Sequence, residues 1–426
     1  MPFERSATAP GGPLPDLDRP GVRVPVSKSV KGRRFRFWGA AYALLVLLTG
    51  TNLATPLYRG YQADFGFSPL TATLIFAAYV AVLIPSLLVA GPLSDAVGGR
   101  AVLLPAVALA ALGSLVFAFA SGTAWLFAAR ALQGLAVGAA SGPLTAALAE
   151  LEPTANRRKA ALVSTVVSVG GLGLGPVLAG ALAQYASAPH VLPFLVEIVL
   201  LVPAAAAVAA LPVTRSGARW RPRRPEIPAA LRPVFATSGT AGFLAFAVIG
   251  LSLTLVPTYV VVLSGSTNLL LGGAAVALML ACSAAAQLVG YGRAARALKT
   301  AGLPLLATGL VLLALAGEAA SLVLLLAATV VAGAGQGLVF LGGLTAVNQA
   351  APADRHAEVL SSFYVVIYLG VGVPVIGVGF LADAVGLLAA VQCFAAFVAV
   401  SCLVMLLVLV RGRRTSPRTA HRTSGT

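Results

Sequence analysis

Charged residues are scarce in this sequence of 426 residues. Asp, Glu, Lys and Arg make up 10% of it, against roughly 25% in soluble domains. Hydrophobic residues make up 59%, and the mean hydropathy is +0.94. Alternation with a period of two is missing, so the apolar runs predict membrane-spanning helices rather than the strands of a barrel, because helices satisfy their own backbone groups in lipid.

Residues typical of catalytic and metal sites are also few. Three cysteines lie inside apolar runs, which excludes a disulfide framework or a thiolate metal cluster. The three histidines, His190, His356 and His421, lie in predicted loops or in the tail. The sequence contains no G-x-x-x-x-G-K-[ST] loop and no H-E-x-x-H motif. We therefore predict that the protein is not an enzyme or an ATP-driven pump and holds no cofactor or metal.

Acidic residues are the rarer charge, with 13 Asp and Glu against 29 Lys and Arg, a net charge of +16. Such a balance is also found in nucleic-acid-binding proteins, and the basic clusters at 28–37 and 411–418 would suit that function. Each cluster, however, adjoins an apolar run, where Lys and Arg fix topology and meet anionic lipid. We expect no nucleic acid, and anionic lipid at the cytoplasmic face.

Apolar runs of about 20 residues, enough to cross a bilayer, predict twelve spans. They cover 37–60, 70–91, 101–121, 124–148, 160–184, 191–213, 234–263, 268–290, 302–316, 320–348, 358–382 and 386–410. The predicted organisation is a disordered cytoplasmic arm (1–36), an N-terminal six-helix bundle (37–213), a basic cytoplasmic linker (214–233), a C-terminal six-helix bundle (234–410) and a basic cytoplasmic tail (411–426).

The distribution of Lys and Arg predicts the orientation. With both termini in the cytoplasm, the arm, linker, tail and the loops near 100, 157, 295 and 355 hold every Lys and Arg except Arg59 and Arg130. The two halves also share letters at a nearly constant offset: Gln133 corresponds to Gln336, and Pro153 to Pro352. This pattern predicts two bundles that arose by duplication.

One polar stretch, GPLSDAVGGR, lies between the second and third predicted spans. It predicts a short turn, because glycines let a helix stop and restart within few residues. The stretch resembles the loop signature of the major facilitator superfamily, and the matching residues are Gly91, Leu93, Asp95, Gly98 and Arg100. Ala96 and Gly99 stand where that family usually has basic residues.

This resemblance implies an all-α polytopic membrane protein with twelve transmembrane helices in two pseudo-symmetric six-helix bundles. It also implies alternating access, and it points to the drug or metabolite:proton antiporter branch. We expect Asp95 and Arg100 to hold the cytoplasmic ends of the bundles together when the other end is open, because an acid can cap a helix amino terminus while the base pairs across the interface.

The fourth predicted span carries Arg130, Gln133, Gly134 and Gly138 at spacings that place them on one helix face. A guanidinium within a bilayer is costly unless it faces protein or water, so Arg130 is a functional candidate; the alternative is an arginine that snorkels to the outer interface. The pattern resembles the family's fourth-span motif, which implies proton coupling. Glu197, the one clear intramembrane carboxylate, is our second candidate and the expected partner of Arg130.

The fifth predicted span carries Gly171, Gly175, Pro176 and Gly180. Glycines spaced by four allow close helix approach, and the proline removes a backbone donor. The segment resembles the family's antiporter motif, which implies export. Another segment, GFLADAVG at 379–386, repeats letters of the loop signature, but we interpret it as a helix-ending turn on the external side. GYGRAARALK at 290–299 corresponds to the loop signature and lacks its acid.

Polar and aromatic residues inside the spans are candidates for a substrate cavity, although each is also a candidate for a hydrogen bond between helices. They are Asn52, Tyr79, Gln133, Tyr259, Gln287, Gln336, Asn348, Tyr364 and Tyr368.

The sequence thus predicts a monomeric carrier in the inner (plasma) membrane. It would export a small, fairly hydrophobic organic compound, a drug or metabolite, in exchange for protons. A proton-linked or facilitative importer of a small metabolite on the same fold is the alternative within this class. A non-transporting membrane receptor is the alternative from another class.

Overall fold

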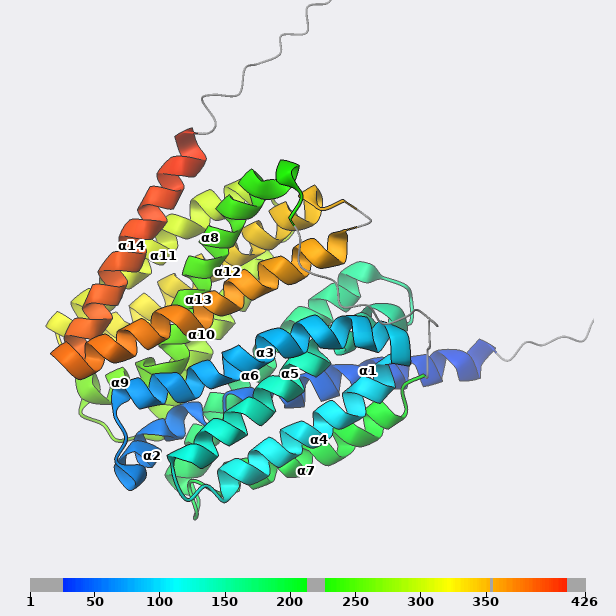
Figure 1. Cartoon of the computed structure of the whole chain (residues 1–426), viewed down its shortest axis with the longest axis horizontal. Coiled ribbons are helices and arrows are strands. Elements are labelled where there is room, and N and C mark those ends of the chain that lie inside the picture. The colour runs from blue at the N-terminus through cyan, green and yellow to red at the C-terminus, as the bar shows by residue number, and fades with distance from the viewer. Residues whose placement is uncertain (1–25, 213–226, 353–354, 412–426) are drawn as a thin grey trace, which may run out of the picture.

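The computed structural model describes residues 26–212, 227–352 and 355–411. Over these residues the chain forms helices and no strand (Figure 1). The helices are α1 (Val26–Thr51), η1 (Thr55–Leu57), α2 (Tyr58–Phe65), α3 (Pro69–Val97), α4 (Gly99–Ala118), α5 (Thr123–Leu151), α6 (Arg157–Tyr185), α7 (Leu192–Ala209), η2 (Ala229–Leu231), α8 (Arg232–Thr254), α9 (Val256–Ser264), α10 (Leu269–Gly290), α11 (Ala295–Glu318), α12 (Leu322–Ala350), α13 (His356–Val385) and α14 (Leu387–Arg411).

Twelve segments of the described chain are long and apolar enough to cross a membrane, which confirms the predicted number. The chain is a multi-pass membrane protein. Helices α1–α7 pack into one bundle and α8–α14 into the other, and the apolar core of the first bundle continues into the second through Leu253, Val276 and Val371. The all-α fold with two related bundles is therefore confirmed. Between the bundles, α3 contacts α13 and α6 contacts α10.

Polar residues and proline fix where several helices begin. Ser68 precedes α3, and its hydroxyl accepts a hydrogen bond from the Thr71 N–H, with Pro69 at the first helical position. Asn268 precedes α10 and accepts from the Leu270 N–H in the same way. These caps matter because the first N–H groups of a helix have no intrahelical acceptor.

The loop between the second and third spans is shorter than the sequence predicted. The expected turn from Gly91 to Arg100 is wrong over most of its length, because α3 continues to Val97 and α4 begins at Gly99. Gly98 alone makes the turn, with φ of 96°, a value that L side chains rarely adopt. Pro92 lies inside α3; a helix at the membrane surface loses one backbone hydrogen bond there and still continues.

Two predicted spans are interrupted. The first ends as a helix at Thr51 and resumes as η1 and α2, and the seventh divides into α8 and α9 at Leu255. Residues 26–36, predicted as part of a disordered arm, belong to α1. The helix of the ninth predicted span, α11, starts at Ala295, seven residues earlier than the predicted 302. Residues 1–25, most of the linker and nearly all of the tail lie outside the described residues.

The two bundles meet at one end of the molecule, which carries α2 and α9 and which we call the α2 end. There, α3 donates a hydrogen bond to α13, and α10 donates one to α6. In Figure 1 the two halves lie together at this end, on the left, and their ribbons diverge toward the opposite end, where α1 begins. We call that opposite end the tail end. The structure is thus closed at the α2 end.

Candidate functional site

Arg130 lies at the centre of a buried polar cluster in the first bundle. Its side chain on α5 is 0% exposed, so it does not snorkel to an interface. Nε donates to the Tyr58 hydroxyl at 2.6 Å, and Nη1 donates to the Thr51 carbonyl at 2.6 Å and to Gln133 Oε1 at 3.1 Å. All these acceptors are uncharged. Nη2 has no hydrogen-bond partner among the described residues.

Aromatic rings surround the same guanidinium. The Arg130 Cζ atom lies 5.4 to 5.9 Å from the ring centroids of Tyr58, Phe76, Tyr79 and Phe117. A cation within about 6 Å of a ring centroid is attracted by the ring quadrupole, more strongly where water is excluded. The charge is therefore stabilised by ring faces and neutral oxygens.

The cluster also holds the end of α1. Arg130 binds the Thr51 carbonyl, and the amide of Gln133 donates to the Gly50 carbonyl at 3.1 Å. The last carbonyls of a helix have no intrahelical donor and carry the negative end of its dipole, so a cation there is stabilised. Arg130 and Gln133 lie on one face of α5, and both act where α1 stops.

Glu197 on α7 reaches the same end of α1 from another side. Its side chain is 2% exposed, and Oε2 accepts a hydrogen bond of 2.5 Å from the Ser114 hydroxyl. A Cβ placed on Gly50 would overlap Oε1 of Glu197, so the carboxylate depends on the glycine for its space. The Cα atom of Gly50 thus faces the Glu197 carboxylate, and the Gly50 carbonyl accepts a hydrogen bond from Gln133.

Arg130 and Glu197 share this cluster without direct ion pairing. No ion pair within 4.0 Å joins the guanidinium to the carboxylate in the described part of the chain. Tyr58, Thr51 and Gln133 occupy three donors of the guanidinium, while Nη2 keeps its hydrogens unused. The cluster therefore contains one fixed cation, one titratable acid and an unsatisfied donor.

The residues expected to line a substrate cavity are dispersed. Tyr79 and Gln133 belong to the Arg130 cluster. Asn52, the first residue after α1, donates to the Leu172 carbonyl of α6 at 3.0 Å. Ser283 donates to Gln336 at 2.5 Å and accepts from Gln287 at 3.1 Å, which joins α10 to α12.

The other cavity candidates lie in the second bundle. The buried Tyr259 hydroxyl has no partner in the described chain and lies against Gly317 of α11. Tyr364 and Tyr368 are half-buried on α13, and Tyr368 packs edge-on against Phe246 at 6.4 Å. Asn348 is exposed near the end of α12.

The glycines of α6 bring other helices into backbone contact. A Cβ at Gly171 would lie 2.5 Å from the Leu45 carbonyl, and one at Gly175 would overlap the Thr49 carbonyl, so both face α1. The carbonyl of Pro176 meets Gly273 of α10 in the other bundle. Close backbone approach of this kind replaces large interlocking side chains at helix interfaces within membranes.

The residues of the loop signature lie at the tail end. Asp95 and Arg100 line a cavity of about 260 Å³, together with Glu150 of α5 and Leu211, which follows α7. Gly91 and Leu93 lie in the last turns of α3, and Gly98 forms the break before α4. The structure therefore groups the acid and the base of this motif within the first bundle.

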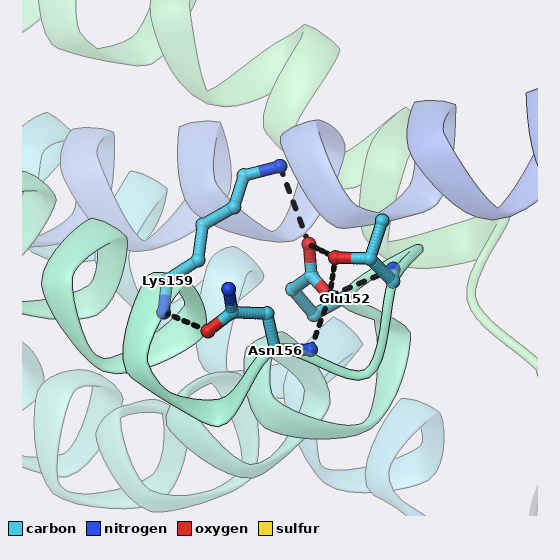
Figure 2. Close-up of polar contacts among 4 residues, drawn as sticks. Glu152, Asn156 and Lys159 are labelled. Atoms are coloured by element: carbon cyan, nitrogen blue, oxygen red, sulfur yellow. Dashed lines mark hydrogen bonds and ion pairs between the residues drawn. The ribbon is translucent and has the colours of Figure 1, made fainter.

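The connection from α5 to α6 contains a buried carboxylate that the sequence did not predict. Figure 2 shows Glu152, which is 0% exposed, with its partners. Its Oε2 accepts from the Thr154 and Asn156 N–H groups, each at 2.7 Å, and its Oε1 lies 3.2 Å from Lys159 Nζ. Burial alone would raise the pKa of Glu152, but the Asn156 N–H, the Thr154 donors and the Lys159 ammonium lower it to about 2.

The GFLADAVG segment forms the end of α13 and the break at Gly386, and its acid makes a further contact. Asp383 Oδ1 accepts a hydrogen bond of 3.2 Å from the Leu70 N–H, across the two bundles. Within the described residues no group of three or more His, Cys, Asp or Glu could hold a metal ion.

Comparisons with known proteins agree with this architecture. A family model described as Major Facilitator Superfamily matches residues 40–317. Curated relatives include MdtD multidrug resistance proteins of Cronobacter sakazakii and Escherichia coli, each 31% identical over 156 residues. That match spans 36% of this chain and 33% of each relative. A crystal structure of a variant nucleoside transporter, NupG, superposes with a TM-score of 0.69 at 12% identity, over 88% of this chain and 99% of that chain, a likeness of fold.

Proposed function

The chain belongs to the Major Facilitator Superfamily, a family of transporters, and from that premise we propose that it exports a small, fairly hydrophobic organic compound in exchange for protons. Transport would proceed by alternating access, in which the α2 end and the tail end open in turn. The observation that carries this proposal is the Arg130 cluster, because its net charge depends on one buried acid.

The charge of the cluster would change by one unit when Glu197 binds a proton. With the carboxylate ionised, the fixed guanidinium and the acid cancel; with the carboxylate protonated, the cluster is a net cation. A buried charge that lacks a partner is costly in an apolar medium. The unused Nη2 donor of Arg130 is therefore free to bind the ionised acid through water, or a polar group of the cargo.

This charge change would act on α1, which belongs to the first bundle and is linked to the second bundle through α6. Arg130 and Gln133 hold the carbonyls at the end of α1, while α6 packs against α1 through Gly171 and Gly175 and reaches α10 through Pro176. A change in the attraction of Arg130 for the end of α1 can thus reach the contact between the bundles. A gradient of one pH unit supplies about 1.4 kcal/mol per proton for such a shift.

The proposed direction of transport and the proposed kind of cargo are supported by different observations. The relatives that match part of the chain are named multidrug resistance proteins, and the glycine-proline pattern of α6 resembles the antiporter motif. Most of the span residues are apolar, which favours lipophilic cargo over sugars or phosphates. The nine cavity candidates stay proposed cargo contacts, and Tyr79 and Gln133 are also part of the proposed proton site.

We propose that the tail end faces the cytoplasm of the inner membrane. The basic loops near 100, 157, 295 and 355 belong to this end, and Lys and Arg collect on the cytoplasmic side of short loops. Both termini would then be cytoplasmic, anionic lipid would meet the basic clusters, and the protein would act as a monomer with bundles at 37–213 and 234–410. On this assignment the structure is the inward-facing state.

Everted membrane vesicles test the direction of transport. Acidified inside by respiration, they should lose part of the proton gradient when a panel of lipophilic dyes and drugs is added, and vesicles with Arg130→Ala should not. Accumulation by whole cells that collapses with an uncoupler would show an importer. Binding without any flux would show a receptor.

Glu197→Gln separates coupling from transport. The amide has nearly the shape of the carboxyl group, and its oxygen can accept the hydrogen bond from the Ser114 hydroxyl, but it cannot release a proton. Exchange of labelled for unlabelled dye should persist, while transport driven by the pH gradient should be lost. Ser114→Ala is the matched control, since it removes the donor and leaves the acid. Normal gradient-driven transport by Glu197→Gln would contradict the assignment of the proton to this residue.

A further inference from the structure

The two bundles touch at the α2 end through two glycines. A Cβ at Gly379 of α13 would lie 3.1 Å from Leu70 Cα and would overlap the Thr73 hydroxyl of α3. A Cβ at Gly180 of α6 would lie 2.8 Å from the Leu269 carbonyl oxygen of α10. At both places a helix of one bundle meets the first turn of a helix in the other bundle at backbone distance.

One helical turn beyond each glycine, a polar side chain reaches the same first turn. Asp383 Oδ1 accepts from the Leu70 N–H at 3.2 Å, and Gln184 Oε1 accepts from the Leu269 N–H at 2.9 Å. Helix α3 begins at Pro69 and α10 at Leu269, so both N–H groups belong to helix starts and have no acceptor within their own helix. Each side chain therefore supplies the missing hydrogen-bond acceptor for a helix start in the other bundle.

The two contacts are copies of each other. The segments Gly180–Gln184 and Gly379–Asp383 read G-A-L-A-Q and G-F-L-A-D. Leu269 follows Leu70 by the same number of residues as Gly379 follows Gly180 and Asp383 follows Gln184. Of the two, Asp383 carries a formal charge, whereas Gln184 does not. An anion at a helix amino terminus also interacts with the helix dipole, which an uncharged amide does less.

We propose that these two segments are paired latches of the gate at the α2 end, and that Asp383 makes the stronger one. The proposal rests on the proposed alternating access, because both hydrogen bonds must break when this end opens. Their strength then contributes to the equilibrium between the two access states. Asp383 is thus a gating residue that controls how often the α2 end opens, while proton and cargo bind elsewhere.

The surroundings of the two latches differ in one further respect. On the Gln184 side, Asn268 donates to the Tyr185 hydroxyl at 3.4 Å, and Arg59 lines a small cavity together with Asn268 and Leu269. An acid placed at position 184 would therefore meet both a helix amino terminus and a nearby cation. Conversion of Gln184 to Glu should strengthen this latch rather than disturb it.

Distance measurements between spin labels test the latches without cargo or a proton gradient, so their result does not depend on export or on Glu197. Labels are placed at Ala63 on α2 and Val323 on α12, exposed residues of opposite bundles at the α2 end, after the three native cysteines are replaced. The pH is chosen so that the protein with both latches unchanged shows both a short and a long distance between the two labels. Asp383→Asn keeps an acceptor and removes the charge, and it should raise the ratio of long to short distances about two- to fivefold.

A transfer of the charge provides the decisive comparison. Gln184→Glu alone should lower the proportion of long distances, and Gln184→Glu with Asp383→Asn should return it close to the starting value. Glu318→Gln is the matched control, because this exposed acid at the same end bonds to Gln392 within its own bundle. An unchanged distribution in both Asp383→Asn and Asp383→Ala, or no return in the double variant, would overturn the proposal.

Discussion

The carboxylate of Glu197 occupies the space into which a side chain at Gly50 would project. Helices α1 and α7 therefore share one small volume that either can fill, and here α7 fills it with an acid. Helix α1, the long helix of the first span, contains no acidic residue. Instead, a carboxylate approaches the end of that span from the sixth, beside the guanidinium of Arg130.

Gly50→Ala should lower the free energy of unfolding by about 1 to 3 kcal/mol, the usual cost of forcing an extra methyl into a filled interior. Gly50→Ala combined with Glu197→Ala should lose less than the sum of the two single changes, because Glu197→Ala frees the space that the methyl group added at position 50 needs. Denaturant unfolding of the purified protein in mild detergent measures both. Additive losses would show that the two residues do not share this space.

Glu152 should make stability depend on pH in the acid range. Its pKa is lowered from 4.5 to about 2, so its stabilising effect is complete above about pH 4.5 and is lost as the pH falls toward 2. The difference in melting temperature between the native sequence and Glu152→Gln should therefore shrink over that interval. Glu150→Gln, which changes an exposed acid two residues earlier in the chain, is the matched control. A constant difference down to pH 2 would argue against the hydrogen-bonded carboxylate.

Gly175→Ala should impair both folding and transport, because its methyl group would overlap the Thr49 carbonyl of α1, and Gly175→Leu should abolish transport. The expected loss of unfolding free energy for the alanine variant is about 1 to 3 kcal/mol. Gly170→Ala is the matched control on the same helix, where the nearest atom, Leu45 Cδ1, is 3.7 Å from the added Cβ. Equal thermal stabilities of the two alanine variants would refute the close α1–α6 contact.

Asp95→Ala should reduce transport at least about tenfold, equivalent to about 1.4 kcal/mol, while the protein still reaches the membrane. The reason is that Asp95 and Arg100 lie together at the tail end, where they are placed to hold the bundles when that end closes. Ser94→Ala, a neighbour in the same cavity, should transport normally. Efflux rates normalised to protein in the membrane fraction measure the effect, and full activity of Asp95→Ala would exclude this role.

The sequence predicted the number of spans and the duplicated architecture well, because run length and hydropathy determine which segments can cross a bilayer. It missed the interruptions after Thr51 and at Leu255, although Pro56 and Pro257 lie at the start of the helical segment that follows each break. It also predicted a turn at Gly91, where the chain stays helical to Val97. Polar composition indicates that a segment leaves the membrane core, but does not indicate where its helix ends.

At the candidate site, helical spacing placed Arg130 and Gln133 on one face, and the structure brings them to the same end of α1. The fit between Gly50 and Glu197 depends on how α7 packs on α1, which no local pattern contains. Glu152 was missed for a related reason: its burial arises from the surrounding helices, although the Thr154 and Asn156 that follow it are residues that commonly cap helices.

The matched contacts of Gly180–Gln184 and Gly379–Asp383 have a consequence for the ancestry of the fold. Each half contributes one helix start that receives a side chain and one helix end that supplies it. Two identical six-span polypeptides would therefore make both contacts with each other around a two-fold axis, as in an isologous dimer. Fusion of the two genes would have freed the copies to diverge, and the aspartate of one against the glutamine of the other is such a divergence within a symmetric interface.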